Sequence, residues 1–268
     1  MTSDEPGAYD RRGQGSPLVL MQGMSATRHF WGEEFLRLLD RHFDLLVMDH
    51  RGVAASPHPA ERFSMTDLAL DAARLIEEQG WADVGIFGVS MGGMVAQELS
   101  LIRPDLVTYA VLGCTRANGR PFMRRGDPAT ERLMAAYVHG DEATTSRNMF
   151  ALSFSEGFAD APDAWPAYAK MARVRIDPAT TLRQIEAIQG FDRRESLADL
   201  RMPVLVLHGS RDQMVPFEEG LDVARRIANS SFESIVDAGH FFWVEQPSRV
   251  VDLMTTFVTG LRSGVLSD

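Results

Sequence analysis

The chain has 268 residues, of which 45% are hydrophobic, so it can bury the core of one sizeable α/β domain or of a domain with an insertion. Its formal net charge of -10 argues against nucleic acid or an anionic membrane as a partner, because both attract clustered cationic surface. Cys114 is the only cysteine, which excludes an intramolecular disulfide and a cysteine-rich zinc site.

The amino-terminal segment is polar and is expected to contribute at most a short edge strand near residues 8–12. It contains no apolar signal core, and no stretch of the chain approaches the roughly 18 apolar residues of a membrane span. We therefore expect no export by a cleaved signal, no bilayer crossing and a cytoplasmic location.

The first half of the chain alternates apolar runs with helical patterns. Expected strands are residues 18–21, 44–48, 84–87 and 107–114. Expected helices are residues 30–39, a segment capped by Ser64 or Thr66 and stopped by Gly80, and a segment that begins after Ser90. Strands that alternate with helices imply βαβ crossovers, and hence a mostly parallel central sheet with helices on both faces.

Residues 116–196 break this alternation, because no convincing strand pattern occurs in them. We interpret the segment as an inserted helical cap, or lid, with helices near residues 128–138, 142–152, 164–173 and 178–188. Its large apolar residues either line a substrate cavity or hold the cap together, with packing favoured for any one of them; they are Met134, Met149, Phe150, Phe154, Phe158, Trp165 and Met171.

The α/β pattern resumes after the cap. It predicts a strand at residues 204–207, a helix at 217–227, a final strand at 232–236 and a closing helix at 250–261. The core therefore comprises residues 1–115 and 197–268, and the cap comprises residues 116–196.

The pentapeptide Gly88-Val89-Ser90-Met91-Gly92 matches the pattern GxSxG between an expected strand and an expected helix. Such a turn is strained, and small residues flank it because a Cβ there would collide with the neighbouring backbone. The strain exposes the serine hydroxyl, so Ser90 is the candidate nucleophile. The competing interpretation is an ordinary serine in a tight βα turn.

A serine hydroxyl needs a base, because it is almost entirely protonated at neutral pH. Of the seven histidines, His139, His208 and His240 follow Ser90 in the chain. His139 lies in the expected cap and His208 closes an expected strand, whereas His240 occupies a glycine-containing loop after the last strand. We therefore predict His240 as the base, against the alternative of a surface histidine.

The acid that orients the base should also follow a strand, and Asp212 does so just before a helix. A turn aspartate that binds local amides is the alternative interpretation. Residues 114–126, which follow the preceding strand, contain no Asp or Glu, so no competing acid is available there. This absence strengthens the choice of Asp212.

Acyl transfer also needs two donors for the oxyanion that develops on the carbonyl oxygen. We predict the backbone N–H of Met91, at the start of the helix after Ser90, and that of Met24, after Gln22-Gly23.

From about Leu18 onward, the chain shows a family resemblance that rests on these motifs. Two further segments contribute to it, Asp49-His50-Arg51-Gly52 and Glu245-Gln246-Pro247. The chain resembles an α/β-hydrolase-fold serine hydrolase of the esterase, enol-lactonase and C–C hydrolase branch with a helical lid. One departure is Gln22, since the family usually has His before the glycine of the oxyanion loop. Haloalkane dehalogenases and epoxide hydrolases of this fold use an aspartate where this chain has Ser90.

The resemblance implies hydrolysis of a small or medium carboxylic ester or lactone through an acyl-enzyme on Ser90. It implies no metal and no organic cofactor, a small-molecule substrate, and neither nucleic acid nor membrane as a partner; a homo-oligomer stays open. The same residues would also serve a C–C bond hydrolase, a thioesterase or a perhydrolase. A non-catalytic ligand-binding homologue is the alternative from another functional class.

Overall fold

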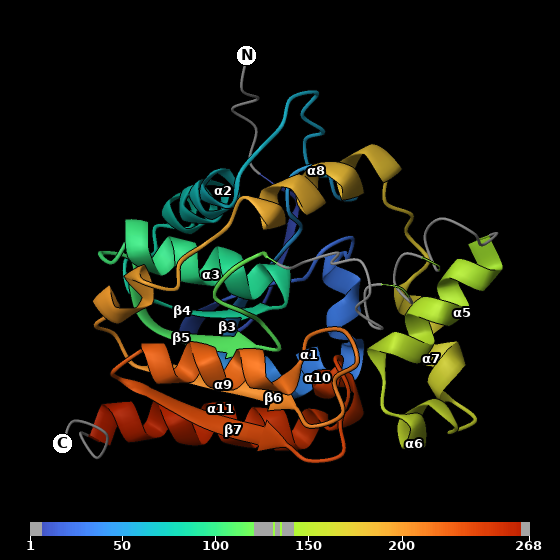
Figure 1. Ribbon diagram of the computed structural model, residues 1–268. Helices are drawn as coiled ribbons and strands as arrows, with labels where there is room; N and C mark the ends of the chain where they lie inside the picture. The colour runs from blue at the N-terminus through green and yellow to red at the C-terminus, as the bar shows by residue number, and fades with distance from the viewer. Residues whose placement is uncertain (1–6, 121–130, 132–134, 136–141, 264–268) are drawn as a thin grey trace.

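The computed structural model describes residues 7–120, 131, 135 and 142–263 (Figure 1). Its centre is a seven-stranded sheet with the strand order β1-β3-β2-β4-β5-β6-β7. The strands are β1 (Tyr9–Gly13), β2 (Ser16–Met21), β3 (Phe43–Met48), β4 (Val84–Val89), β5 (Val107–Gly113), β6 (Val204–Gly209) and β7 (Ser230–Ile235).

Only β1 runs antiparallel to its neighbour, β3, and it lies at the edge of the sheet, as its polar sequence predicts. All other neighbouring strands are parallel. The four central strands β2, β4, β5 and β6 have almost entirely buried residues, because helices cover both of their faces. The predicted α/β fold with a mostly parallel sheet is therefore confirmed.

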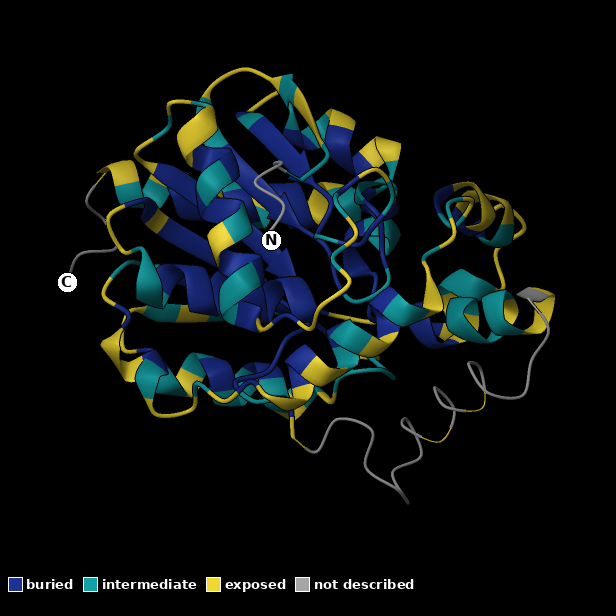
Figure 2. Cartoon of the chain, turned by 90° about the horizontal axis from the view of Figure 1, so that it is seen from above, coloured by how far each residue is buried: buried dark blue, intermediate teal, exposed yellow. Residues whose placement is uncertain are grey.

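Two layers of helices sandwich the sheet. One layer contains α2 (Met65–Glu78), α3 (Met91–Ile102) and α9 (Phe217–Arg226), and the other contains α1 (Glu33–Leu39) and α11 (Pro247–Ser263). In Figure 1, α2 and α3 lie above the strands and α11 lies below them. Figure 2 shows the strands as the buried centre of the molecule.

Between β5 and β6 the described residues form four helices, α5 (Glu142–Ser153), α6 (Glu156–Ala159), α7 (Ala164–Met171) and α8 (Pro178–Gln189). Helices α5 to α7 gather beside the main body, whereas α8 lies next to α2 and α3 (Figure 1). The predicted helix at residues 128–138, with Met134, lies outside the described residues except for positions 131 and 135.

Several local predictions need correction. The single helix expected at residues 30–39 is a 3₁₀ turn, Arg28–Trp31, followed by α1, because Gly32 between them has a φ of 73° that ends the first turn. The short helices α6 and α10 (Phe242–Glu245) were not expected. Ser64, rather than Thr66, caps α2, in a capping box with Asp67.

The strand order reverses beside β2, which positions the site. From β2 the chain moves outward to β3, and it then returns across β2 to form β4. The loops after β2 and β4 therefore leave the sheet side by side but in opposite directions, and such a switch point creates a crevice at the carboxyl edge. None of the helices in the described residues is long and apolar enough to span a bilayer.

Candidate active site

Ser90 lies at the sharp turn between β4 and α3. Its backbone has a φ of 54° and a ψ of -120°, a conformation that costs a non-glycine residue about 1–3 kcal/mol. A Cβ on Gly88 would collide with the carbonyl of Gly92, and one on Gly92 would collide with the carbonyl of Met21. The glycines of the pattern are therefore required by close backbone approach, as the sequence predicts.

Asp212 lies on the loop between β6 and α9, and its carboxylate is fully buried. Oδ1 accepts hydrogen bonds from the backbone N–H groups of Met214 at 2.8 Å and Val215 at 2.9 Å. Oδ2 lies 2.7 Å from Nδ1 of His240. The structure thus brings together the predicted acid and the predicted base, and it also shows the local amide bonds that a turn aspartate makes.

Asp212 is held as a carboxylate. Burial alone would raise its pKa, but the adjacent His240 and hydrogen bonds from His208 and His240 outweigh burial and hold the pKa well below its usual range. An ionised carboxylate only accepts hydrogen bonds, so Nδ1 of His240 carries the proton and Nε2 is left as the basic nitrogen.

His208 is a second imidazole on the same carboxylate, a contact that its place near the end of β6 does not predict. Its Nε2 lies 3.2 Å from Oδ2 of Asp212 and 3.1 Å from the carbonyl oxygen of Val215. Both neighbours are acceptors, so the proton lies on Nε2. The only sequence signal for this contact is that His208 precedes Asp212 by four positions across the end of a strand.

The His240 imidazole also contacts Cys114, which follows β5 in a strained backbone with a φ of 39°. Its Nε2 lies 3.9 Å from Sγ of Cys114, and among the described residues no hydrogen bond joins Nε2 to Ser90. Burial raises the pKa of the Cys114 thiol, so the sulfur stays protonated and can donate weakly to Nε2. Sγ of Cys114, a carboxylate oxygen of Asp212 and a ring nitrogen of His240 lie within 4.8 Å of one another, and Asp212 and His240 are hydrogen-bonded to each other.

The loop that carries His240 is fixed by Glu245, which lies in α10. Oε1 of Glu245 accepts hydrogen bonds from the backbone N–H of Gly239 at 2.7 Å and from that of Ser155 at 3.0 Å. The backbone N–H of Phe241 also donates to the carbonyl of Ser153, at 2.8 Å. The histidine loop is therefore tied directly to the segment between α5 and α6.

The loop after β2 lies against the serine turn. A Cβ built on Gly23 would lie only 3.1 Å from Cβ of Ser90, so the two loops are in close contact. His50 supports this loop, because its buried Nε2 lies 2.9 Å from the carbonyl oxygen of Gln22. The side chain of Gln22 turns back on the backbone, where Oε1 accepts a hydrogen bond from the N–H of Gly23 at 3.2 Å.

A cavity of about 450 Å³ joins these groups, which is within the usual range for small-molecule sites. Ser90, His240, Met24 and Met91 all line it. Of the apolar cap residues singled out from the sequence, Met149 is the only one among the described residues that lines this cavity. The other described ones are not in its lining; Phe150, for example, has its ring centroid 5.4 Å from that of Trp165.

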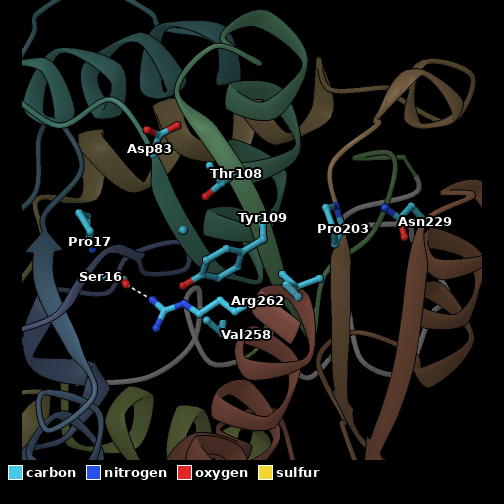
Figure 3. Close-up of a pocket in the computed structure, with 11 residues that line it drawn as sticks. Ser16, Pro17, Asp83, Thr108, Tyr109, Pro203, Asn229, Val258 and Arg262 are labelled. Atoms are coloured by element: carbon cyan, nitrogen blue, oxygen red, sulfur yellow. Dashed lines mark hydrogen bonds between the residues drawn. The ribbon is translucent and has the colours of Figure 1, made fainter. Parts of the chain in front are cut away.

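A second cavity, of about 390 Å³, opens at the opposite edge of the sheet (Figure 3). Figure 3 shows Tyr109 at its centre, with Arg262 bonded to Ser16 and Asp83 further away. The described residues that line it include no histidine and no cysteine. Among its described lining residues, this cavity therefore offers no imidazole that could serve as a base.

Comparisons with known proteins agree with this geometry. A family model described as alpha/beta hydrolase fold matches residues 16–247. BpoC of Mycobacterium tuberculosis, named as a candidate non-heme bromoperoxidase, is 28% identical over 263 residues, which cover 96% of this chain and 98% of BpoC.

Solved structures give the same result. A hydrolase from Pseudomonas aeruginosa PA01 superposes with a TM-score of 0.82 at 26% identity and covers 96% of both chains. A thermophilic esterase from Thermogutta terrifontis has a TM-score of 0.78 at 26% identity and covers 94% of this chain and 92% of the esterase. The chain therefore belongs to the α/β hydrolase family.

Proposed function

We propose that this protein is a serine hydrolase that cleaves a small or medium carboxylic ester or lactone through an acyl-enzyme on Ser90. The observation that carries the proposal is the 2.7 Å hydrogen bond between His240 and Asp212, beside a strained serine that lines the same cavity as His240. Relatives named as a hydrolase and an esterase support the reaction class.

In the proposed reaction, Oγ of Ser90 attacks the substrate carbonyl and Nε2 of His240 takes its proton. The imidazolium gives this proton to the leaving alcohol oxygen as the ester C–O bond breaks, which leaves the acyl group on Oγ. A water molecule, deprotonated by Nε2, then attacks the acyl-enzyme and releases the acid, and Oγ of Ser90 recovers its proton. The imidazolium that forms is stabilised by Asp212, which keeps Nδ1 protonated and oriented but takes no proton itself. Proton transfer requires Oγ to come within about 2.6–3.2 Å of Nε2, so the imidazole must exchange its Cys114 contact for Ser90 when substrate binds.

The developing oxyanion would be stabilised by the backbone N–H groups of Met91 and Met24. Met91 is the first residue of α3, so its amide belongs to the positive end of the helix dipole. Met24 follows the closely packed Gly23. The N–H group, not the side chain, acts in both cases, so Gln22 in place of the family's histidine leaves both donors in the chain.

We also propose that residues 116–196 form the cap that selects substrates, without supplying a catalytic group. Met149 and Tyr168, from α5 and α7, line the cavity together with the serine turn, which supports this role. We further propose a small-molecule substrate and a cytoplasmic location.

Hydrolysis of p-nitrophenyl esters of increasing chain length, beside a panel of lactones, tests the reaction class. The wild type should release acid and alcohol with Ser90-dependent kinetics, and Ser90→Ala should lose turnover far beyond tenfold while it keeps its unfolding free energy. Cleavage of only thioesters or of diketone-like acids would instead place the chain with thioesterases or C–C hydrolases, and peracid formation with perhydrolases. Ligand binding without turnover would identify a non-catalytic homologue.

A further inference from the structure

The described lining of the cavity at Ser90 and His240 has basic but no acidic side chains, although the chain as a whole is acidic. The protein has 37 acidic and 27 basic residues. The described residues that line the cavity nevertheless include two arginines, Arg116 and Arg175, and no Asp or Glu. A neutral ester would gain nothing from these cations, whereas an anionic substrate would be attracted by them.

Arg116 is fixed close to the nucleophile. It follows Thr115, whose Oγ1 donates a hydrogen bond of 2.7 Å to the carbonyl oxygen of Ser90. The carbonyl of Arg116 accepts a hydrogen bond of 3.1 Å from Nε2 of Gln97, a buried side chain of α3. The backbone of Arg116 is therefore tied to the serine turn and to the helix that follows it.

The guanidinium of Arg116 is only partly satisfied. Its Nη2 donates to Oε1 of Glu219 at 2.9 Å, and Glu219 is not among the described residues that line the cavity. Its Nε is buried and has no hydrogen-bond partner among the described residues. The residue as a whole is only 8% exposed, so little water reaches it. A buried, unpaired donor on a cation is costly unless a ligand supplies an acceptor.

A second unpaired donor lies on the same cavity. Nε2 of Gln22 is buried and has no partner within the described part of the chain. Two side chains of the cavity lining, Arg116 and Gln22, thus each keep a buried donor without an acceptor among the residues that the structure describes. A carboxylate offers two acceptor oxygens that suit a guanidinium.

We propose that the substrate carries a free carboxylate in addition to the ester or lactone carbonyl, and that the guanidinium of Arg116 binds this carboxylate. Glu219 holds the guanidinium in place from outside the cavity. This inference rests on the proposed hydrolase function and names its substrate class, a small carboxylate-bearing ester or lactone.

Two matched substrate pairs test the inference. One places the carboxylate on the acyl side, p-nitrophenyl hydrogen adipate against p-nitrophenyl hexanoate, and the other on the alcohol side, 6-acetoxyhexanoate against hexyl acetate. For at least one pair, the wild type should show a kcat/KM about tenfold or more higher for the anionic member, the effect of one charge-assisted hydrogen bond. Equal or lower values for the anionic member of both pairs would overturn the proposal.

Arg116→Gln should lower that anionic-to-neutral ratio by about tenfold or more, because it removes the cation and its Nε–H. Arg211→Gln is the matched control, since it changes net charge equally at an exposed residue outside the cavity lining and should leave the ratio unchanged. Arg116→Lys keeps the charge but not the Nε–H, so it should give an intermediate ratio and serves if the Gln variant does not fold. A ratio in either Arg116 variant equal to that of Arg211→Gln would contradict the proposal.

Failure of this inference can be told apart from failure of the proposed function. Ser90-dependent turnover of p-nitrophenyl acetate tests the hydrolase chemistry without any carboxylate. Turnover of that acetate with no preference within the pairs would reject the Arg116 site alone, whereas absence of Ser90-dependent turnover on every ester would reject the hydrolase and, with it, the carboxylate-bearing substrate.

Discussion

Gly23→Ala is the substitution whose effect on the site follows most directly from the packing of the two loops. The new methyl would lie 3.1 Å from Cβ of Ser90 and 3.5 Å from its Oγ. The first distance is tighter than ordinary van der Waals contact by a few tenths of an ångström, and the φ of Gly23 is not in the left-handed region. The chain can therefore accept alanine, but Ser90 must shift.

The expected loss is large for activity and small for stability. A misplacement of about 1 Å costs about a hundredfold in rate, so a shift of a few tenths should lower kcat by on the order of tenfold. The unfolding free energy should change by less than about 1 kcal/mol, because alanine also restricts the unfolded chain. Steady-state hydrolysis of p-nitrophenyl acetate and urea unfolding measure the two effects.

Two glycine variants calibrate this result. Gly157→Ala meets nothing within 4 Å and should leave both activity and stability near the wild type. Gly92→Ala would place its methyl against the carbonyl of Met21, a backbone atom that cannot move aside, and should destabilise the fold. Wild-type kcat in a folded Gly23→Ala protein would refute the close contact between the oxyanion loop and the nucleophile.

The other predictions concern the acid, its second imidazole and the cavity wall. Asp212→Asn should lower kcat by about a thousandfold or more. The folded pKa of Asp212 is lower than the unfolded value of about 3.9, so its stabilisation is present above that value and is lost as pH falls from there through the folded pKa. In denaturant titrations, the difference in unfolding free energy between wild type and Asp212→Asn should therefore shrink only below about pH 4. His208→Leu removes a donor from the oxygen that His240 uses, so the acidic limb of the pH profile of kcat/KM should move to higher pH, and an unchanged profile would show that His208 only packs. Met149→Ala should change the ranking of hydrolysis rates among acyl chain lengths, whereas Phe150→Ala, one residue away but packed on Trp165, should mainly lower thermal stability. The reverse result would mean that Phe150, not Met149, lines the cavity.

The sheet and the proximity of Asp212 to His240 could be predicted from the sequence because local patterns locate the strands and the loops that follow them. Apolar runs such as residues 84–89 have few structures other than buried strands, and the glycines around Ser90 are required by backbone contacts that the pattern itself encodes. The contact between Asp212 and His240 could be expected because the loops after parallel strands share one edge of a sheet.

What the sequence did not reveal depends on contacts between distant segments. The apolar pattern of α5 does not say which of the neighbouring residues Met149 and Phe150 faces the cavity, since that depends on how α7 packs against it. Similarly, Arg116 and Glu219 are 103 positions apart, so neither their ion pair nor the unpaired Nε could be inferred from spacing. The break at Gly32 was missed because the apolar periodicity continues through it.

Covalent labelling with a fluorophosphonate, followed by mass spectrometry of the intact protein and its peptides, tests the central claim most directly. The wild type should gain one phosphonyl group, on Ser90, and His240→Ala should react far more slowly because the hydroxyl loses its base. Ser90→Ala should not be labelled. An unlabelled Ser90 in the folded wild type, or equal labelling of wild type and His240→Ala, would contradict the assignment of Ser90 as an activated nucleophile.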